Sequence, residues 1–157
     1  PTRQGKKMVI DQQKCVGCGR CIGVCPVDAV VNNFDEAFDV LNCKMAEYAK
    51  AVVDGRPQFH VSLVMDVSPY CDCHSENDVP IVPDIGMFAS FDPVALDLAC
   101  ARAVNAAQVN QGSLLAESTV TGRDHFGRVT PETNWESQIA HGKKLGLGSD
   151  DYELITI

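Results

Sequence analysis

The chain has 157 residues, of which 45% are hydrophobic and 22% charged, which suits one medium soluble domain or a small module joined to a larger one. Its net charge of −8 argues against nucleic acid as a partner. No apolar run approaches the ~20 residues that span a bilayer, and no segment resembles a signal peptide, so we expect no membrane span.

The first residues, 1–7, have no apolar pattern and no initiator methionine, so we expect a linker or a cut end there. Residues 8–10 then predict a short strand. The first 31 residues hold five basic and two acidic residues, whereas acidic residues dominate the rest of the chain. We expect these cations to offset a bound anionic group, and less readily to form a docking face for an acidic electron donor.

Four cysteines follow within residues 15–26 in the run C-x2-C-x2-C-x3-C-P. Bacterial ferredoxins bind a cubane iron–sulfur cluster with this spacing, because thiolates three residues apart on a tight loop converge on one cluster. Gly17 and Gly19 permit the dihedral angles that such a loop needs. A zinc site normally uses two separated C-x2-C pairs, and a disulfide framework would not crowd four cysteines together. The predicted ligands of a 4Fe-4S cluster are Cys15, Cys18, Cys21 and Cys25.

The number of clusters stays open. Residues 27–31 predict a helical turn and a return strand, which would complete one half of a bacterial ferredoxin fold, but no second half follows. In two-cluster ferredoxins the fourth cysteine of each run binds the other cluster. Cys25 therefore either completes the first cluster or binds a second one. In the latter case Cys43, Cys71, Cys73 or a cysteine before Pro1 would supply the missing ligand.

A long helix is predicted after the cysteine run. Asn33 and Glu36 fit an N-terminal capping box, and Gly55 with Pro57 ends the helix. Cys43 lies on this helix and is expected in the core more often than as a ligand. The expected apolar face consists of Phe34, Phe38, Leu41, Met45, Tyr48, Ala49 and Val52.

Residues 59–67 alternate like a strand with one buried face, and Ser68-Pro69 stops it. His60 is expected to be an ordinary strand residue and not a ligand. The predicted buried face consists of Phe59, Val61, Leu63, Met65 and Val67.

A second group of polar side chains follows this strand at residues 71–78. Cysteine, histidine and carboxylates gathered after a strand end favour a metal or reactive-thiol site. The spacing C-x-C-H is weaker evidence than C-x2-C, because two thiolates one residue apart need a bent backbone to share a metal. The candidate ligands of an additional metal ion, or remote cluster ligands, are Cys71, Cys73 and His74.

In residues 79–157, helix-capping residues, prolines and glycines predict where helices and strands begin and end. Residues 79–90 predict an extended segment and a short buried strand, and Asp92-Pro93 begins a helix that runs to about residue 107, with Cys100 in the core. Residues 108–129 predict an irregular connection. Thr130-Pro131 opens a helix around Trp135 that Gly146 closes, with His141 on its surface, and residues 152–157 predict a terminal strand.

Several stretches of the chain match a known family: residues 45–50, 71–74, 80–86 and 89–97, together with Trp135 and 146–149. Through them residues 45–105 resemble the later half of the "domain of unknown function three-six-two" family of uncharacterised iron–sulfur proteins. Residues 8–31 resemble a ferredoxin module. The resemblance implies a longer protein with an α/β region first, of which this chain is the C-terminal portion. It implies no particular reaction.

Together these observations predict an α+β or α/β protein with two parts: a ferredoxin-like segment at 1–32 and an α/β domain with a mixed sheet at 33–157. Eight cysteines with a cluster motif indicate a reducing compartment, hence the cytoplasm. The first functional hypothesis is electron transfer to or from a protein redox partner. Two alternatives stay open, a structural metal module and a redox enzyme. The site of that enzyme would consist of Cys71, Cys73, His74, Glu76 and Asp84.

Overall fold

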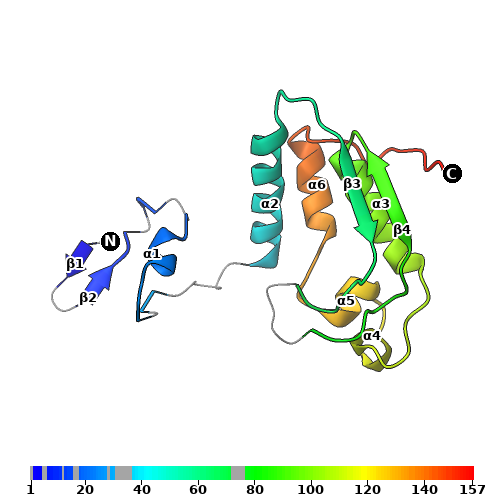
Figure 1. The fold of residues 1–157 in the computed structure, drawn as a ribbon, viewed down its shortest axis with the longest axis horizontal. Coiled ribbons are helices and arrows are strands. Elements are labelled where there is room, and N and C mark those ends of the chain that lie inside the picture. The colour runs from blue at the N-terminus through cyan, green and yellow to red at the C-terminus, as the bar shows by residue number, and fades with distance from the viewer. Residues whose placement is uncertain are drawn as a thin grey trace. The chain divides into compact units, whose positions relative to one another are not determined.

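The computed structural model describes residues 2–4, 7–11, 13–15, 18–27, 29–30, 37–71 and 77–157. The chain divides into two compact units, Pro1–Glu36 and Ala37–Ile157 (Figure 1). The predicted boundary at 32/33 lies among residues 31–36, outside the described part, and stays a prediction. Each unit mixes helix and strand, in agreement with the expected α+β class.

The first unit contains a strand pair and one turn of helix. Strands β1 (Thr2–Gln4) and β2 (Lys7–Val9) pair antiparallel with Thr2 opposite Val9. The expectation of a linker was therefore wrong for residues 2–4 and 7, whereas the strand predicted at residues 8–10 is present one residue earlier. A return strand was predicted within residues 27–31. Ala29 and Val30, which the structure describes there, are not in a strand. The strand that pairs with β2 thus comes from before the cysteine run.

The second unit begins with helix α2 (Phe38–Val53), which packs against helix α6 (Glu136–Lys144). As predicted, Gly55 follows the end of α2 and Gly146 the end of α6, both with positive φ (67° and 70°). The predicted capping box at residues 33 and 36 lies outside the described residues. Helix α3 (Pro93–Ala106) begins at the predicted cap, where the Asp92 carboxylate accepts a hydrogen bond from the Ala95 N–H at 2.9 Å.

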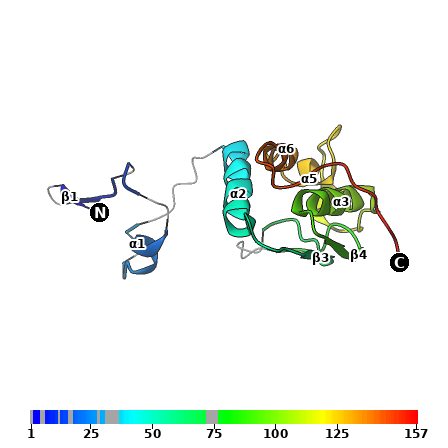
Figure 2. The ribbon, with the colours of Figure 1, turned by 90° about the horizontal axis from the view of Figure 1, so that it is seen from above.

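Strands β3 (His60–Val64) and β4 (Gly86–Ser90) form an antiparallel pair with His60 opposite Ser90 and Val64 opposite Gly86. Helix α3 contacts both strands, and Figure 2 shows α3 and α6 on the same side of this sheet. Among the described residues every strand pairing is antiparallel, so the expected mixed sheet is not seen there. No described helix is long and apolar enough to cross a membrane.

The core of this unit lies where the end of β3 meets the segment before β4. The buried residues Val64, Ile81, Val82, Val104 and Leu115 form one cluster. Backbone bonds hold the segment in place: the Ile81 N–H donates to the Val67 carbonyl, and the Ile85 N–H to the Val64 carbonyl, each at 2.8 Å. Burial of these aliphatic side chains is the main stabilising contribution within this unit.

Two predicted buried faces are exposed in the structure. On α2 the buried residues are Asn42 and Ala46, whereas Tyr48 is 69% exposed and Leu41 47%. Asn42 turns inward because its amide donates to the Asn134 carbonyl at 2.8 Å and to the Ser137 hydroxyl at 3.0 Å, beside α6. The α6 contact, not the apolar stripe, decides which face of α2 is covered. The α2 side chains expected inside but exposed are Phe38, Leu41, Met45, Tyr48, Ala49 and Val52.

On β3 the same inversion occurs, because His60, Ser62 and Val64 point toward α3. The side chains Phe59, Val61, Leu63 and Met65, predicted to be buried, are exposed. The strand is also shorter than predicted, since Asp66 adopts a positive φ of 50° and ends it.

Further differences from the sequence-based expectations concern helix α6, two short helices and one missing strand. The helix expected to open at Thr130-Pro131 begins at Glu136 instead. The connection at 108–129 contains α4 (Leu114–Glu117) and α5 (His125–Val129), capped by Ser113 and Asp124. Residues 151–157 form no strand. His141, expected on the surface, contacts Glu47 of α2 at 3.0 Å and is largely covered.

Candidate functional site

Cys15 and Cys18 precede the short helix α1 (Arg20–Gly23), Cys21 lies on it, and Cys25 follows it. Gly19 precedes this helix with φ 68°, a left-handed conformation that favours glycine, as the sequence predicted. Gly17 lies outside the described residues. All four thiols of the run are free: Cys15 and Cys18 are exposed, and Cys21 and Cys25 are half-buried. They are therefore accessible donors of the type that binds iron or zinc.

Cys25 has the most developed surroundings of the four. The backbone N–H of Val27 lowers the pKa of its thiol most, and the N–H groups of Ala29 and Val30 lower it further. The Ala29 N–H lies 3.3 Å from Sγ. Such donors favour the thiolate, which is the form that binds metal and whose hydrogen bonds tune a cluster's potential. The sequence analysis named Cys25 but missed the role of Ala29, which lies four residues after Cys25.

The structure does not gather the four thiols at one point. Within the described ranges no three or more Cys, His, Asp or Glu side chains lie close enough together to hold a metal ion. The chemical fit rests instead on the donor set: four accessible thiols on eleven residues, a left-handed glycine between the second and third, and backbone N–H groups directed at the fourth. These features suit a tetrathiolate iron–sulfur centre.

The remote ligand candidates belong to the second unit or lie outside the description. Cys43 is half-buried on α2, and Cys71 is exposed after β3. Cys73, His74 and Glu76 lie outside the described residues, so the second predicted site is not seen as a whole. Cys100 lies on α3 beside the core cluster, as expected, and burial raises the pKa of its thiol.

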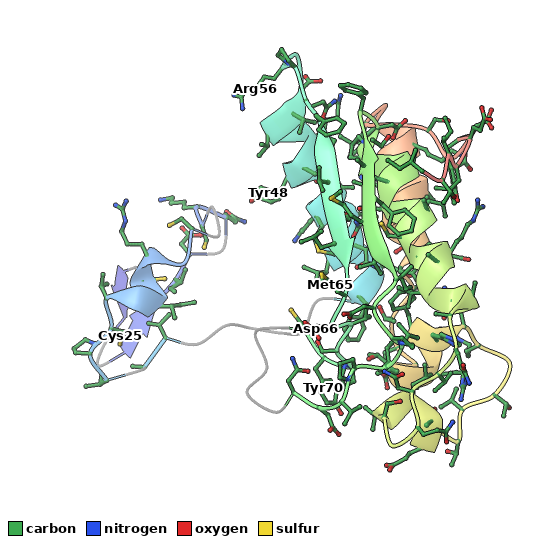
Figure 3. The ribbon with its side chains drawn as sticks, turned by 45° about the vertical axis from the view of Figure 1, so that its right-hand side comes forward. Cys25, Tyr48, Arg56, Met65, Asp66 and Tyr70 are labelled. Atoms are coloured by element: carbon green, nitrogen blue, oxygen red, sulfur yellow. The ribbon has the colours of Figure 1, made fainter. Side chains whose placement is uncertain are left out.

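Asp84 was a candidate member of the enzyme site, and the structure shows a different use for it. Its carboxylate accepts a hydrogen bond from the backbone N–H of Asp66 at 2.9 Å. Asp66 is the described non-glycine residue with positive φ, where the chain leaves β3 (Figure 3). Asp84 therefore stabilises the turn that ends the strand.

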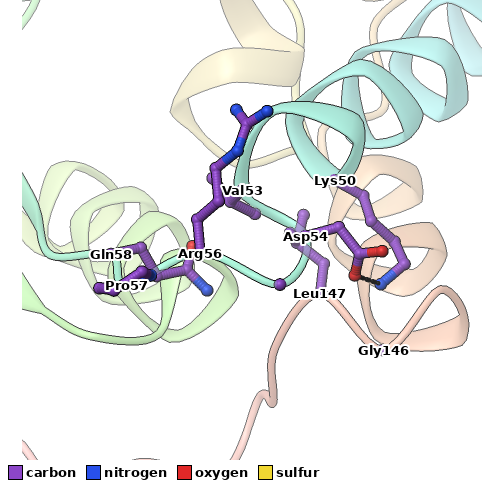
Figure 4. A pocket seen from close by; sticks show the side chains of 9 residues that line it. Lys50, Val53, Asp54, Arg56, Pro57, Gln58, Gly146 and Leu147 are labelled. Carbon is purple, nitrogen blue, oxygen red and sulfur yellow. Dashed lines mark hydrogen bonds and ion pairs between the residues drawn. The ribbon is translucent and has the colours of Figure 1, made fainter.

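A pocket of about 390 Å³ lies at the C-terminal end of α2, where Gly146 and Leu147 face it (Figure 4). Its charged side chains already have partners. Lys50 Nζ lies 2.8 Å from Asp54 Oδ1, and this contact lowers the pKa of Asp54. The Arg56 guanidinium donates to the Val52 carbonyl at 2.6 Å. Lys50 and Asp54 thus neutralise each other, whereas the Arg56 guanidinium contacts a neutral carbonyl.

A family model described as "Domain of unknown function (DUF362)" matches residues 3–102. An uncharacterised ferredoxin of Methanocaldococcus jannaschii is 32% identical over 68 residues, which are 40% of this chain and 83% of that protein. Ferredoxin-2 of Desulfomicrobium norvegicum is 50% identical over 24 residues, 15% of this chain and 41% of the relative. A polyferredoxin-like protein of M. jannaschii is 32% identical over 37 residues, 24% of this chain and 23% of its own length. No solved structure matches the chain significantly.

Proposed function

Since the chain belongs to the DUF362 family and is similar to proteins named ferredoxins, we propose that it carries electrons on a 4Fe-4S cluster. The observation that carries this proposal is the run of four free thiols with backbone N–H groups at the last of them. A bound cluster would supply a one-electron carrier whose potential depends on sulfur hydrogen bonds and exposure. The proposed ligands are Cys15, Cys18, Cys21 and Cys25.

The chain's own residues would do the rest. Gly19 allows the loop to turn back on itself, and the Ala29 N–H would hold the Cys25 sulfur in its thiolate form. The exposure of Cys15 and Cys18 leaves the site open to a protein redox partner. Free thiols of this kind persist in a reducing compartment, so we propose a cytoplasmic location.

The test is metal analysis of the protein purified without oxygen. We expect iron and acid-labile sulfide in comparable amounts, and a broad absorbance near ~400 nm that dithionite bleaches. Cys18→Ser should remove most of this absorbance, whereas Cys100→Ser, a substitution on α3, should leave it unchanged. Zinc without sulfide would favour the structural metal module instead, and protein without metal would contradict both.

Three further variants separate one cluster from two. If Cys25 completes the cluster, Cys25→Ser should reduce iron and sulfide together, as Cys18→Ser does. If Cys25 binds a second cluster, its substitution should leave the reduced-state EPR spectrum of the first intact. Iron loss in Cys43→Ser or Cys71→Ser would then identify the remote ligand.

A further inference from the structure

The open side of the β3–β4 sheet is apolar, whereas the side toward α3 mixes polar and apolar residues. His60, Ser62 and Ser90 occupy the face toward α3 together with Val64 and Phe88, which pack into the core. The pairs Val61–Ala89 and Leu63–Met87 occupy the opposite face, where Leu63 is 64% and Met87 70% exposed. An antiparallel sheet with one face in water normally places polar residues on that face. An exposed apolar sheet face is instead typical of a surface that binds another protein.

The apolar surface continues beyond the strands. Phe59 and Phe91 flank one end, with ring centroids 5.0 Å apart and exposed fractions of 58% and 75%. Met65, 46% exposed, follows the other end of β3 (Figure 3). We name this surface the open sheet face; its residues are Phe59, Val61, Leu63, Met65, Met87, Ala89 and Phe91.

The size of this surface suits a specific interface. From the exposed fractions of its side chains, the open sheet face offers on the order of 700 Å² of apolar area, above the largest patch of an ordinary monomer. A stable interface of standard size buries roughly 800 Å² on each partner. None of its seven residues is charged, so two copies of the surface can face each other without bringing like charges together.

We propose that the open sheet face binds the same face of a second copy, giving a twofold-symmetric dimer. Two such sheets would stack about 10 Å apart, as in a β-sandwich. With the twofold axis across the strands, the Phe59–Phe91 end of each copy meets the Met87 end of the other. Thioether–aromatic contacts are favourable, so the two ends complement each other chemically. This inference goes beyond electron transfer and holds whether or not a cluster is bound.

The net negative charge of the second unit opposes formation of this dimer. Residues 37–157 contain seventeen acidic and eight basic residues, so two copies repel each other at long range. Salt screens this repulsion and leaves the apolar contact intact. Dimer affinity should therefore rise with ionic strength, whereas an association held by ion pairs would weaken.

The experiment is sedimentation velocity of the full chain, without oxygen and with a reducing agent, between about 1 and 100 µM at low and high salt. We expect a species of twice the 17.0 kDa chain mass. Met87→Lys should weaken the dimer at least tenfold, although lysine lowers the net negative charge. Leu63→Thr, which keeps a strand-forming residue, should weaken it less. The control Tyr48→Lys removes an exposed aromatic residue on α2 and should change nothing.

Three results would overturn the proposal. The first is a wild-type chain that stays monomeric at the highest concentration. A chain that binds a different polypeptide but not a second copy of itself belongs to this first result. The second is a dimer that Tyr48→Lys weakens as much as Met87→Lys does. The third is a dimer that dissociates as salt rises. Circular dichroism checks the folding of each variant, and if Met87→Lys is misfolded, Leu63→Thr decides the outcome.

Discussion

The two units differ in what can hold them together. None of the first-unit residues between positions 10 and 30 whose exposure the structure describes is buried, whereas the second unit has the cluster of Val64, Ile81, Val82, Val104 and Leu115. A segment this short that buries little apolar surface usually owes its fold to a metal or to disulfides. The four thiols of the first unit are free, so no disulfide between them stabilises it, and under the proposed function the bound cluster would supply that stability.

Cysteine shows the same contrast at the level of one residue type. Backbone N–H groups lower the pKa of Cys25 in the first unit, while burial raises the pKa of Cys100 in the second. The first environment favours the thiolate that binds metal, and the second keeps the thiol as a small apolar side chain. Burial and hydrogen bonding therefore decide which cysteines are available for chemistry.

Removal of the metal should produce the largest difference between the units. Treatment of the purified full chain with a chelator and an oxidant should speed amide hydrogen exchange in residues 7–30 at least tenfold, because the fold of a metal-stabilised segment is lost with its metal. Exchange in residues 81–115 should not change. Equal protection loss in both segments, measured by mass spectrometry, would show that the two units unfold as one.

Leu115→Ala should affect the second unit alone. Leu115 is fully buried in the core cluster, so its truncation should lower the free energy of unfolding by about 2–5 kcal/mol. Urea unfolding followed by the fluorescence of Trp135, the one tryptophan of the chain, measures this change. The matched control Leu154→Ala, at a position 61% exposed, should cost far less. A loss of cluster absorbance in Leu115→Ala would contradict the separation of the units.

Gly148→Ala should have a smaller effect within the second unit. A Cβ at position 148 would overlap Asp92 Oδ1, the atom that caps α3, while Asp92 Oδ2 accepts the Ser149 N–H at 2.7 Å. Weakening this cap should cost about 1–2 kcal/mol in thermal or urea unfolding. Gly23→Ala, where a Cβ meets open space, serves as the control and should leave that transition unchanged. If Gly148→Ala unfolds like the wild type, the C-terminal segment can move away from Asp92 without loss of stability.

Features that depend on near neighbours in the chain were predictable. Asp92-Pro93 begins α3, and glycines at 55 and 146 follow the ends of α2 and α6, because a cap or a left-handed residue acts within one helical turn. The cysteine run is local in the same sense, since its spacing alone suggests four cluster-binding thiols. The short helices α4 and α5 were missed although Ser113 and Asp124 provide their caps, because one helical turn has no apolar period.

The sequence by itself thus determined the cysteine run, the start of α3 and the ends of α2 and α6, since these follow from residues a few positions apart. The tertiary structure decided which faces are covered. Periodicity identified an apolar stripe on α2 and on β3. In the structure, however, α6 packs against the Asn42 side of α2, and α3 packs against the Ser62 side of β3. A period reports that two faces differ, whereas burial depends on which distant segment packs against each of them.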